Sequence, residues 1–521
     1  MRGVLALLLV GVLCLYPVVA ARFVLVDDHE IMSYAPRTRP GPGDTAITQL
    51  GSVLEHEARA LGRFRPVYWA VRLAEVDVLG QNPATWHTLV LMLGLASAGL
   101  LFSTARLVGV CCVPAFLLAA SLLVAPGVSS VWVRLGPPET IGTFFFLLSA
   151  FSAAMSARGR GTIWDVAFVV SAILATLSKE PFALSAPALA GLRVVLEQRP
   201  ARWRAVVAAA VVIAGGTAVG AIAYKVAASA GISTYGGRYL SGVDLPQFAV
   251  TVLHNAAILV VASTAWLAPL IALPGATVRR YRLSRRAGLA VILVVVLVIP
   301  QLALYSLQGV MEGRYELPST IGLAAVPALA LSWLASLGAR RAYLLGVAAW
   351  SSVLLLFGFS TWTYATAFTA DSVQLDRMLA TVAESAPPNA LVALVADPGR
   401  QFEPALSIVD QLVSRGRADL RMRLVPLRRD GQYTPNEAAL ARNLPDSIPL
   451  LEAVSAGSPC ANLGAAIVLA NIPPDEVLPC AAAELRPVRF TTTALVWGSE
   501  TVSLRPRLPG VVSVGYLALV P

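Results

Sequence analysis

The chain has 521 residues, of which 57% are hydrophobic and only 13% are charged. Soluble domains carry about 25% charged residues, so this composition excludes an ordinary soluble protein. The formal net charge of +10 does not indicate nucleic-acid binding, because the arginines fall between apolar runs and no basic patch with interleaved aromatic residues occurs.

Apolar runs of about 20 residues recur along the first two thirds of the chain, and such runs are typical of membrane-spanning helices. They predict about eleven spans, at 4–24, 86–105, 107–125, 139–156, 163–178, 181–197, 205–224, 248–271, 287–306, 318–337 and 342–362. The expected fold class is therefore a polytopic α-helical membrane protein. Residues 365–521 lack such runs and predict a separate C-terminal α/β domain, which gives domains of 1–364 and 365–521.

Arginine residues divide the short loops between these spans into two alternating sets. The richer set holds Arg106, Arg158, Arg160, Arg199, Arg202, Arg204, Arg279, Arg280, Arg282, Arg285, Arg286, Arg340 and Arg341. The poorer set holds only Arg134, Lys179, Lys225, Arg238 and Arg314. Cytoplasmic loops carry the excess of Lys and Arg, so the richer set is expected inside. The N-terminus is then cytoplasmic, and the C-terminal domain lies outside the plasma (inner) membrane.

A dense polar cluster, Asp27-Asp28-His29-Glu30, directly follows the first apolar run. A charge at the bilayer centre costs roughly 2.5–3.5 kcal/mol, so the cluster is expected at the outer membrane–water boundary. A solvated topological stop and a functional site are the two interpretations of such a cluster.

The first apolar run also has two interpretations. Arg2, a leucine-rich core and the small residues around Ala20 are typical of a cleavable signal peptide as well as of a membrane anchor. Cleavage would free the N-terminal end of the acidic cluster and leave the orientation of the other spans unchanged.

The first outer loop, residues 22–85, is long and contains two predicted helices. One has a single apolar face, formed by Leu50, Val53, Leu54, Ala58 and Leu61. That face predicts either a helix lying in the membrane interface or one packed against the C-terminal domain. The other helix is expected over 67–79, with Pro66 in its first turn.

The remaining outer loops are short, and each carries a cation, usually with an acid close by. They are Arg134-Leu135-Gly136-Pro137-Pro138-Glu139, Ser178-Lys179-Glu180-Pro181, Tyr235-Gly236-Gly237-Arg238-Tyr239 and Glu312-Gly313-Arg314-Tyr315-Glu316. The cytoplasmic loops contain few acids, so the chemistry is expected on the outer face. Nucleotide sugars are absent there, and an activated sugar must arrive on a lipid such as a polyprenyl phosphate. Such a site needs a carboxylate to deprotonate an acceptor hydroxyl and cations to hold the leaving phosphate.

The C-terminal domain mixes predicted strands, at 390–395, 465–469 and 489–497, with predicted helices at 403–413 and 435–443. It has no Gly-rich phosphate loop, so scaffolding or acceptor binding is expected of it rather than catalysis. Cys460 and Cys480 lie in this exported part and are a candidate disulfide.

An acidic pair just after the first span, in a long outer loop with interfacial helices, resembles the membrane-embedded GT-C glycosyltransferases. Protein O-mannosyltransferases and the lipid A aminoarabinose transferase are examples of that superfamily. The Arg65-Pro66 helix followed by Trp86-His87, the Lys179-Glu180 element and the Arg314-Tyr315 element resemble motifs of these enzymes in the same order. The resemblance covers roughly residues 1–340.

This resemblance implies an inverting transfer of a sugar from a polyprenyl-phosphate donor to an acceptor hydroxyl of a lipid, glycan or protein. It implies Asp28 or Asp27 as general base, with Glu30 supporting. The O-mannosyltransferase pattern is Asp-Glu, whereas this chain has Asp27-Asp28 and then Glu30, so the choice between the two aspartates stays open.

Four cations are candidates for holding the donor phosphate, and interfacial snorkelling is the alternative for each of them: Lys179, Arg314, Arg238 and Arg65. Five further residues are expected to support the site: Glu180, Glu139, Arg134, Tyr315 and His29. Oxygen ligands from the acidic cluster suit Mg²⁺ or Mn²⁺, but the O-mannosyltransferase-like branch does not need a metal, and none is expected.

Two other functions compete with the enzyme. A transporter or lipid flippase would place ionisable residues near the bilayer midplane, whereas these predicted spans contain few Asp, Glu or Lys residues. A non-catalytic GT-C-like protein of cell-envelope assembly would keep the architecture without needing Asp28.

Overall fold

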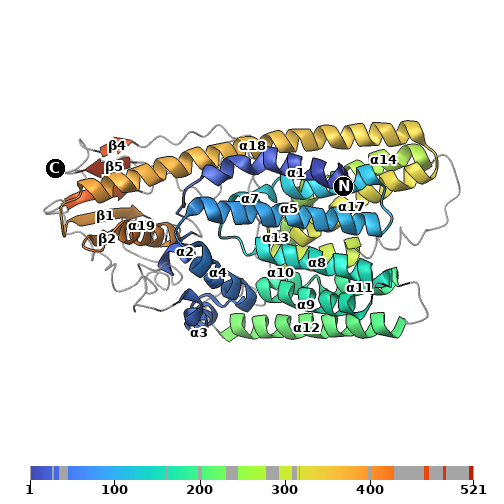
Figure 1. Ribbon diagram of the computed structural model, residues 1–521, viewed down its shortest axis with the longest axis horizontal. Helices are drawn as coiled ribbons and strands as arrows, with labels where there is room; N and C mark the ends of the chain where they lie inside the picture. Colours follow the sequence, from blue (N-terminus) through green and yellow to red (C-terminus); the bar gives the residue numbers. More distant parts are fainter. Residues whose placement is uncertain are drawn as a thin grey trace.

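The computed structural model describes residues 2–25, 28–34, 45–159, 161–197, 202–229, 245–276, 293–307, 314–315, 317–396, 402–426, 463–468, 485–487 and 516–519. Within these ranges some side chains, among them those of His29 and Glu30, are not described. A bundle of long helices occupies one end of the molecule and a small sheet the other, with the short helices α2, α3 and α4 between them (Figure 1).

The bundle has one or two helices in each of the eleven predicted ranges, and one short helix at 129–133 lies between two of those ranges. They are α1 (Arg2–Leu15), η1 (Tyr16–Ala20), α5 (Pro83–Leu107), α6 (Cys112–Val124), α7 (Ser129–Val133), α8 (Glu139–Ala157), α9 (Thr162–Ser178), α10 (Glu180–Ala183), α11 (Ala186–Leu196), α12 (Arg202–Ser229), α13 (Leu245–Ala262), α14 (Leu267–Ala276), η5 (Leu293–Val298), α16 (Ile299–Ser306), α17 (Leu317–Ser336) and α18 (Arg340–Ser385). Among the described residues, seven helices are long and apolar enough to cross a membrane. Shorter apolar helices include Cys112–Val124 and Thr162–Ser178. The chain is thus an integral membrane protein.

Two predicted spans are interrupted. The range 181–197 contains the short α10, a turn and then α11. A proline is the second residue of each helix, Pro181 in α10 and Pro187 in α11. Proline has no N–H to continue a helix from the preceding turn. The range 248–271 is divided into α13 and α14 by a turn in which Thr264 has a φ of 60°.

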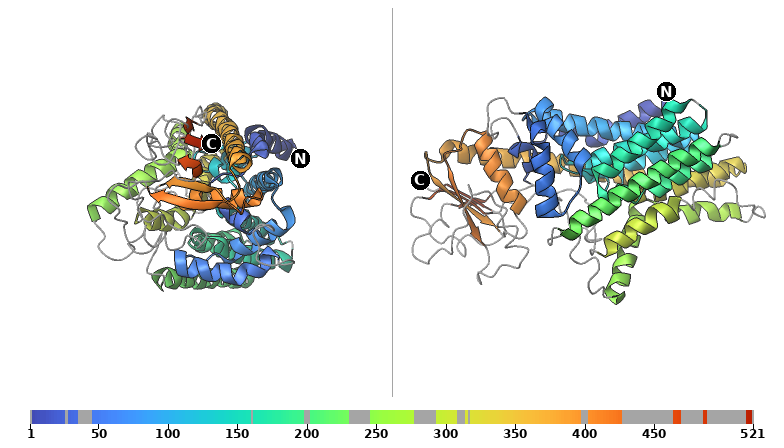
Figure 2. Two further views of the ribbon diagram at one scale, coloured as in Figure 1. Left: turned by 90° about the vertical axis from the view of Figure 1, so that its left-hand side faces the viewer. Right: turned by 90° about the horizontal axis from the view of Figure 1, so that it is seen from below.

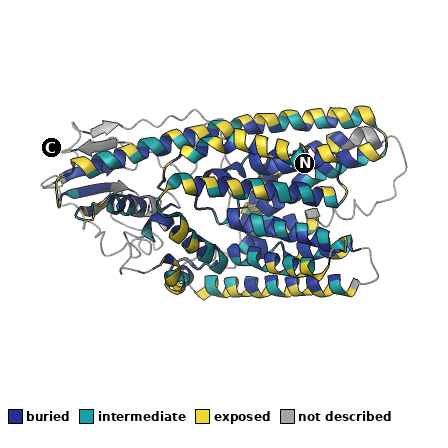
Figure 3. Ribbon diagram, viewed as in Figure 1, coloured by how far each residue is buried: buried dark blue, intermediate teal, exposed yellow. Residues whose placement is uncertain are grey.

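The surface of the bundle is apolar where lipid would contact it. Large hydrophobic side chains are exposed along α12 and along the first half of α18 (Figure 3). They include Val206, Val207, Val211, Ile213, Leu344, Leu345, Leu355 and Leu356. In lipid such side chains need no cover from the protein, because the hydrocarbon tails are as apolar as the side chains themselves.

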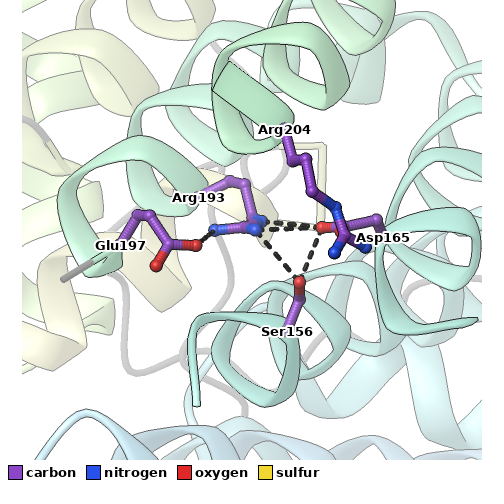
Figure 4. A network of polar contacts seen from close by, with 5 residues as sticks. All are labelled: Ser156, Asp165, Arg193, Glu197 and Arg204. Atoms are coloured by element: carbon purple, nitrogen blue, oxygen red, sulfur yellow. Dashed lines mark hydrogen bonds and ion pairs between the residues drawn. The ribbon is translucent and has the colours of Figure 1, made fainter. Parts of the chain in front are cut away.

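A polar network joins four helices of the bundle at the N-terminal end of α9 (Figure 4). Arg193 donates from Nε and Nη2 to Asp165 Oδ1 at 3.1 and 3.0 Å, and its Nη1 lies 2.9 Å from Glu197 Oε2. Arg204 Nη2 lies 3.0 Å from Asp165 Oδ2, and Ser156 Oγ bonds to both Asp165 and Arg193. Buried charges need such partners, so this network fixes α8, α9, α11 and α12 together.

The outer loop after α1 forms α2 (His29–Ser33), η3 (Ala46–Gln49), α3 (Leu50–His56), the π-helical η4 (Glu57–Leu61) and α4 (Pro66–Leu79). Pro66 begins α4, as predicted. The apolar face of α3 packs on α4, since Val53 is buried in a cluster with Trp69 and Leu73. The Pro- and Gly-containing stretch 36–43 of this loop, for which the sequence predicts a turn, lies outside the described residues.

In the described part of the C-terminal domain the strands form a five-stranded mixed sheet set off from the bundle (Figure 2). Its strands are β1 (Leu391–Ala396), β2 (Arg421–Pro426), β3 (Leu463–Val468), β4 (Leu485–Pro487) and β5 (Tyr516–Leu519), in the order β2-β1-β3-β5-β4. The pairs β1–β2 and β1–β3 are parallel, while β3–β5 and β4–β5 are antiparallel. The helix α19 (Phe402–Ser414) connects β1 to β2. The predicted elements at 435–443 and 489–497 lie outside the described residues.

One helix joins the two parts of the molecule. The 46-residue α18 crosses the bundle and continues to the sheet, so no break in secondary structure marks the expected boundary at 364/365. Its last third, including Leu375 and Leu379, packs in the core of the C-terminal domain.

Candidate active site

A buried ion pair joins two helix ends of the bundle. Lys179 follows the last residue of α9, and Glu139 is the first residue of α8. Lys179 Nζ pairs with the carboxylate of Glu139, and both side chains are at most 3% exposed. Glu139 follows Pro138 and sits at a helix N-terminus, where the unbonded backbone N–H groups favour a negative charge. The position of Glu139 at the start of α8 therefore favours the ionised carboxylate that Lys179 needs as a partner.

Close packing one turn into α8 brings the two partners together. Gly142 faces the ring of Phe182, and a Cβ atom built at Gly142 would lie 2.4 Å from Phe182 Cε2. Phe182 comes three residues after Lys179 in the chain. The missing side chain at position 142 thus allows the α9–α10 turn to approach the start of α8.

A third helix end contributes an aromatic ring and a second cation. Arg314 and Tyr315 lie just before α17, and the Tyr315 ring centroid is 4.2 Å from Lys179 Nζ. Arg314 Cζ lies 4.9 Å from the same centroid, and Arg314 Nη2 donates to Tyr315 Oη at 3.1 Å. Tyr305, buried in α16, packs against the Tyr315 ring with 5.9 Å between the centroids.

The charges of these residues do not cancel. Lys179 and Arg314 supply two positive charges, and Arg314 also acts electrostatically on Glu139, the acid of the group. The group of Lys179, Glu139, Arg314 and Tyr315, called the cation cluster below, therefore carries a surplus of one positive charge. Such a surplus at the end of three helices suits an anion held at the membrane boundary.

A second ion pair ties the outer loop to α10. Arg65, which precedes α4, has its Nε 3.5 Å from Glu180 Oε1, and Glu180 is the first residue of α10. Burial acts to raise the pKa of the Glu180 carboxyl, but the charge of Arg65 and further hydrogen-bonding and charge contacts outweigh it, so the pKa lies below its usual value. Glu180 is thus held ionised beside the cation cluster.

The helix α4 also holds the loop that precedes α8. Tyr68 Oη donates to the carbonyl of Gly136 at 2.9 Å, and Arg72 Nη2 donates to the carbonyl of Leu135. Pro137 and Pro138 have no N–H, so few backbone donors are available nearby for the carbonyls of this loop. Tyr68 and Arg72 supply donors instead. Neither Tyr68 nor Arg72 was predicted from the sequence as a site residue. The sequence feature that could have indicated a role for Arg72 is its charge, because it lies inside the mostly apolar stretch 67–79.

Asp28 lies at the start of α2, and its side chain is 1% exposed. Its Oδ2 accepts a hydrogen bond from the Val24 N–H at 2.7 Å. The helix α2 contacts α4, which also contacts α9. Thus α4 is the element that lies between the acidic cluster and the helix bearing Lys179.

One predicted residue is buried at a helix end, and several others lie outside the described residues. Arg134 is buried at the end of α7. Asp27, Arg238, Cys460 and Cys480 lie outside the described residues, as do the side chains of His29 and Glu30. Among the side chains that are described, no group of three or more His, Cys, Asp or Glu residues is arranged to hold a metal ion.

Comparison with known proteins gives a structural likeness. No family model matches the chain, and no curated protein sequence matches it. The crystal structure of ArnT from Cupriavidus metallidurans bound to undecaprenyl phosphate matches with a TM-score of 0.53 and 14% identity, covering 93% of this chain and 95% of that one. The apo structure of the same protein covers 95% of this chain and 97% of its own, with 14% identity and a TM-score of 0.48.

ArnT is the lipid A aminoarabinose transferase of the GT-C superfamily. The match to its lipid-bound structure extends over nearly the whole length of both chains. The protein therefore shares the overall fold of that structure, a polytopic α-helical membrane bundle with a C-terminal α/β domain, and this fold class was predicted from the sequence.

Proposed function

We propose that the protein is an inverting glycosyltransferase that moves a sugar from a polyprenyl-phosphate donor to an acceptor hydroxyl on the outer face of the membrane. The observation that carries the proposal is the cation cluster, in which Lys179 and Arg314 meet around Tyr315 and Glu139. The chain also shares its fold with ArnT, whose crystal structure holds undecaprenyl phosphate.

The position of the cluster suits a lipid phosphate. Lys179, Glu139 and Arg314 lie at the ends of apolar helices rather than in their middles. A polyprenyl chain dissolves in the hydrocarbon core, so its phosphate lies at the same boundary as these helix ends. Lysine is a point charge and arginine a planar fork, and both bind phosphate through charge-assisted hydrogen bonds.

Asp28 is the favoured general base, with Asp27 as the alternative and Glu30 in support. The carboxylate takes the proton of the acceptor hydroxyl while that oxygen attacks the anomeric carbon of the donor. A bond forms between the acceptor oxygen and this carbon, and the bond from the carbon to the phosphate oxygen breaks in line with it. Polyprenyl phosphate leaves with the electron pair, and the configuration at the sugar inverts.

The remaining predicted residues have supporting roles in this proposal. Arg65 and Glu180 fix the outer loop on α10, next to Lys179. Arg65 and Arg238 are further cations for the phosphate, Arg134 supports the site, and His29 is a candidate for contact with the acceptor. The transfer needs no redox step, and no metal ion is invoked.

The test uses the purified protein in liposomes that contain a membrane-lipid extract as the source of acceptor. The liposomes receive undecaprenyl-phosphate-linked sugars or the matching nucleotide sugars, and the released undecaprenyl phosphate is measured by mass spectrometry. We expect release from the lipid-linked sugar alone, and its loss in Asp28→Asn. Turnover of the nucleotide donor would contradict the outer-face site. Movement of an intact lipid-linked sugar between leaflets, without cleavage, would identify a flippase instead.

A further inference from the structure

The segment that leads from the first span toward Asp28 contacts both parts of the molecule. Ala21 and Val24 belong to the core of the membrane bundle, while neighbouring residues contact α18 and the C-terminal domain, more than 340 residues later in the chain. The Arg22 N–H donates to Ser372 Oγ in α18 at 2.9 Å. The Leu25 side chain is 1% exposed and belongs to the core of the C-terminal domain, with Ile408 and Leu412 of α19.

Two side chains of α19 hold the backbone at Val24. Ser407 Oγ and Gln411 Nε2 donate to the Val24 carbonyl, at 3.2 and 3.3 Å. Gln411 Nε2 also lies 3.3 Å from Ser407 Oγ, so the two donors support each other. Both side chains are almost fully buried. A buried amide and a buried hydroxyl aimed at one carbonyl fix its direction, because leaving them without a partner is costly.

The same residue holds the candidate base. The Val24 N–H donates to Asp28 Oδ2 at 2.7 Å, while the Val24 carbonyl accepts from α19. Both polar groups of this residue's backbone are therefore engaged, one toward Asp28 and one toward the C-terminal domain. The N–H and the carbonyl of Val24 belong to neighbouring peptide planes, so α19 fixes the plane directly after the one that donates to Asp28.

The helix on the other side of Asp28 is anchored to the same element. Ser33 Oγ, in α2, bonds to Asp410 of α19. Figure 1 shows α2 beside α19, and the two helices are in contact. Asp28 thus lies between two attachments to α19, at Val24 and at Ser33.

We propose that Ser407 and Gln411 are positioning residues for Asp28, so that the C-terminal domain sets the geometry of the base. This rests on the proposed function, in which Asp28 takes a proton from the acceptor. Proton transfer requires the base within hydrogen-bonding distance of its target, and a misplacement of about 1 Å can cost on the order of 100-fold in rate. The domain therefore acts in the chemical step and does more than bind an acceptor.

The test compares the double variant Ser407→Ala with Gln411→Met against the control Asp376→Asn. Asp376 pairs with Arg415, so the control breaks a contact between α18 and α19 without touching Val24. We expect the double variant to lose about 10- to 100-fold in kcat while the KM for the lipid-linked donor stays within about twofold, because the cation cluster is untouched. Ser407→Thr, which keeps the hydroxyl, should retain near-normal kcat.

A second measurement is independent of any substrate. Hydrogen–deuterium exchange followed by mass spectrometry should show faster exchange in peptides covering 21–34 for the double variant, and unchanged exchange there for Asp376→Asn. Exchange in β1 and β2 should stay slow in both, which shows that the sheet is folded. Unchanged exchange at 21–34 in the double variant overturns the inference.

The two proposals fail in different ways. If Asp28→Asn is inactive but the double variant keeps its full kcat, the positioning role is wrong and the proposed function stands. If Asp28→Asn keeps full activity, the mechanism is wrong, and exchange at 21–34 still decides whether α19 holds this segment.

Discussion

The ammonium of Lys179 is paired with the carboxylate of Glu139, a residue 40 positions earlier in the chain, and both are buried. Removing one partner of a buried pair leaves a charge without compensation, at a cost of about 3–5 kcal/mol. The two partners also differ in function, because only Lys179 carries the positive charge that can bind a donor phosphate. Substitution of the two partners should therefore separate stability from binding.

We expect Lys179→Gln and Glu139→Gln to change lipid-phosphate affinity in opposite directions. Lys179→Gln removes a charge-assisted hydrogen bond, worth about 1.5–3 kcal/mol or roughly tenfold and more in affinity. Glu139→Gln removes the acid that competes with phosphate for Lys179 and Arg314, so binding should tighten. Titration of the purified protein with undecaprenyl phosphate in detergent measures both. Equal weakening in the two variants would show that the pair is purely structural.

Asp28→Asn should lower the rate of sugar transfer by about 100- to 10,000-fold, the usual contribution of a general base. The amide has the same size and can still accept from the Val24 N–H, so expression and thermal stability should change little. The control is Asp77→Asn, because Asp77 is another outer-loop carboxylate that accepts backbone N–H groups, from Ala46 and Ile47. Full activity in both Asp28→Asn and Asp27→Asn would remove the carboxylate-base mechanism.

Tyr315 is expected to act mainly through its ring. Tyr315→Phe keeps the aromatic face at Lys179 and loses only the acceptor for Arg314, whereas Tyr315→Leu loses both. A cation–π contact of this kind is worth about 0.5–2 kcal/mol. Affinity for undecaprenyl phosphate should therefore fall more in Tyr315→Leu than in Tyr315→Phe. The reverse order would mean that the hydroxyl matters more than the ring.

Gly142→Ala should destabilise the protein by about 1–3 kcal/mol, the usual cost of overpacking. The new methyl would meet the Phe182 ring and push the α9–α10 turn away from Glu139. Gly99→Ala is the matched control, because Gly99 is also helical and a Cβ there would contact nothing within 4 Å. Thermal unfolding of both variants gives the comparison, and Phe182→Leu should restore part of the loss. Equal unfolding temperatures for the two alanine variants would contradict this account of the close approach.

The Arg65–Glu180 pair should respond to acid in a defined direction. The folded-state pKa of Glu180 is lowered, so its contribution to stability is present above the unfolded value near 4.5 and is lost as pH falls through the folded value. The difference in unfolding temperature between wild type and Glu180→Gln should accordingly stay constant from pH 7 to about 5 and shrink only at more acidic pH. A difference that vanished already at pH 6 would mean that this carboxylate gains nothing from Arg65.

Much of the helical framework could be predicted from the sequence because its signals are local. Apolar runs give the bundle, Pro66 gives the start of α4, and the positions 390–395 and 403–413 give β1 and α19. Lys179, Glu139, Arg314 and Tyr315 could be selected as loop residues on one expected face, although nothing in the sequence pairs one with another.

The missing information is non-local. The meeting of Glu139 with Lys179 depends on how closely Gly142 allows Phe182 to approach, which no single stretch of sequence expresses. The apolar face at 50–61 predicted either the membrane interface or the C-terminal domain, whereas Val53 of this face packs on α4. Likewise, the sequence places Leu25 at the end of the first apolar run, yet its side chain packs in the core of the C-terminal domain.

Because α18 is continuous, the number of residues in it sets the distance of the C-terminal domain from the bundle and the rotation of the domain about the helix axis. Its 46 residues extend about 69 Å at 1.5 Å each, more than twice a hydrocarbon core of about 30 Å. Thr361 bonds to the bundle at Val124, and Ser372 bonds to Arg22. One residue inserted between Thr361 and Ser372 would rotate everything beyond it by about 100°. An insertion or deletion in this part of α18 would therefore reorient the whole C-terminal domain, whereas a substitution on the exposed face of the helix would leave its length and direction unchanged.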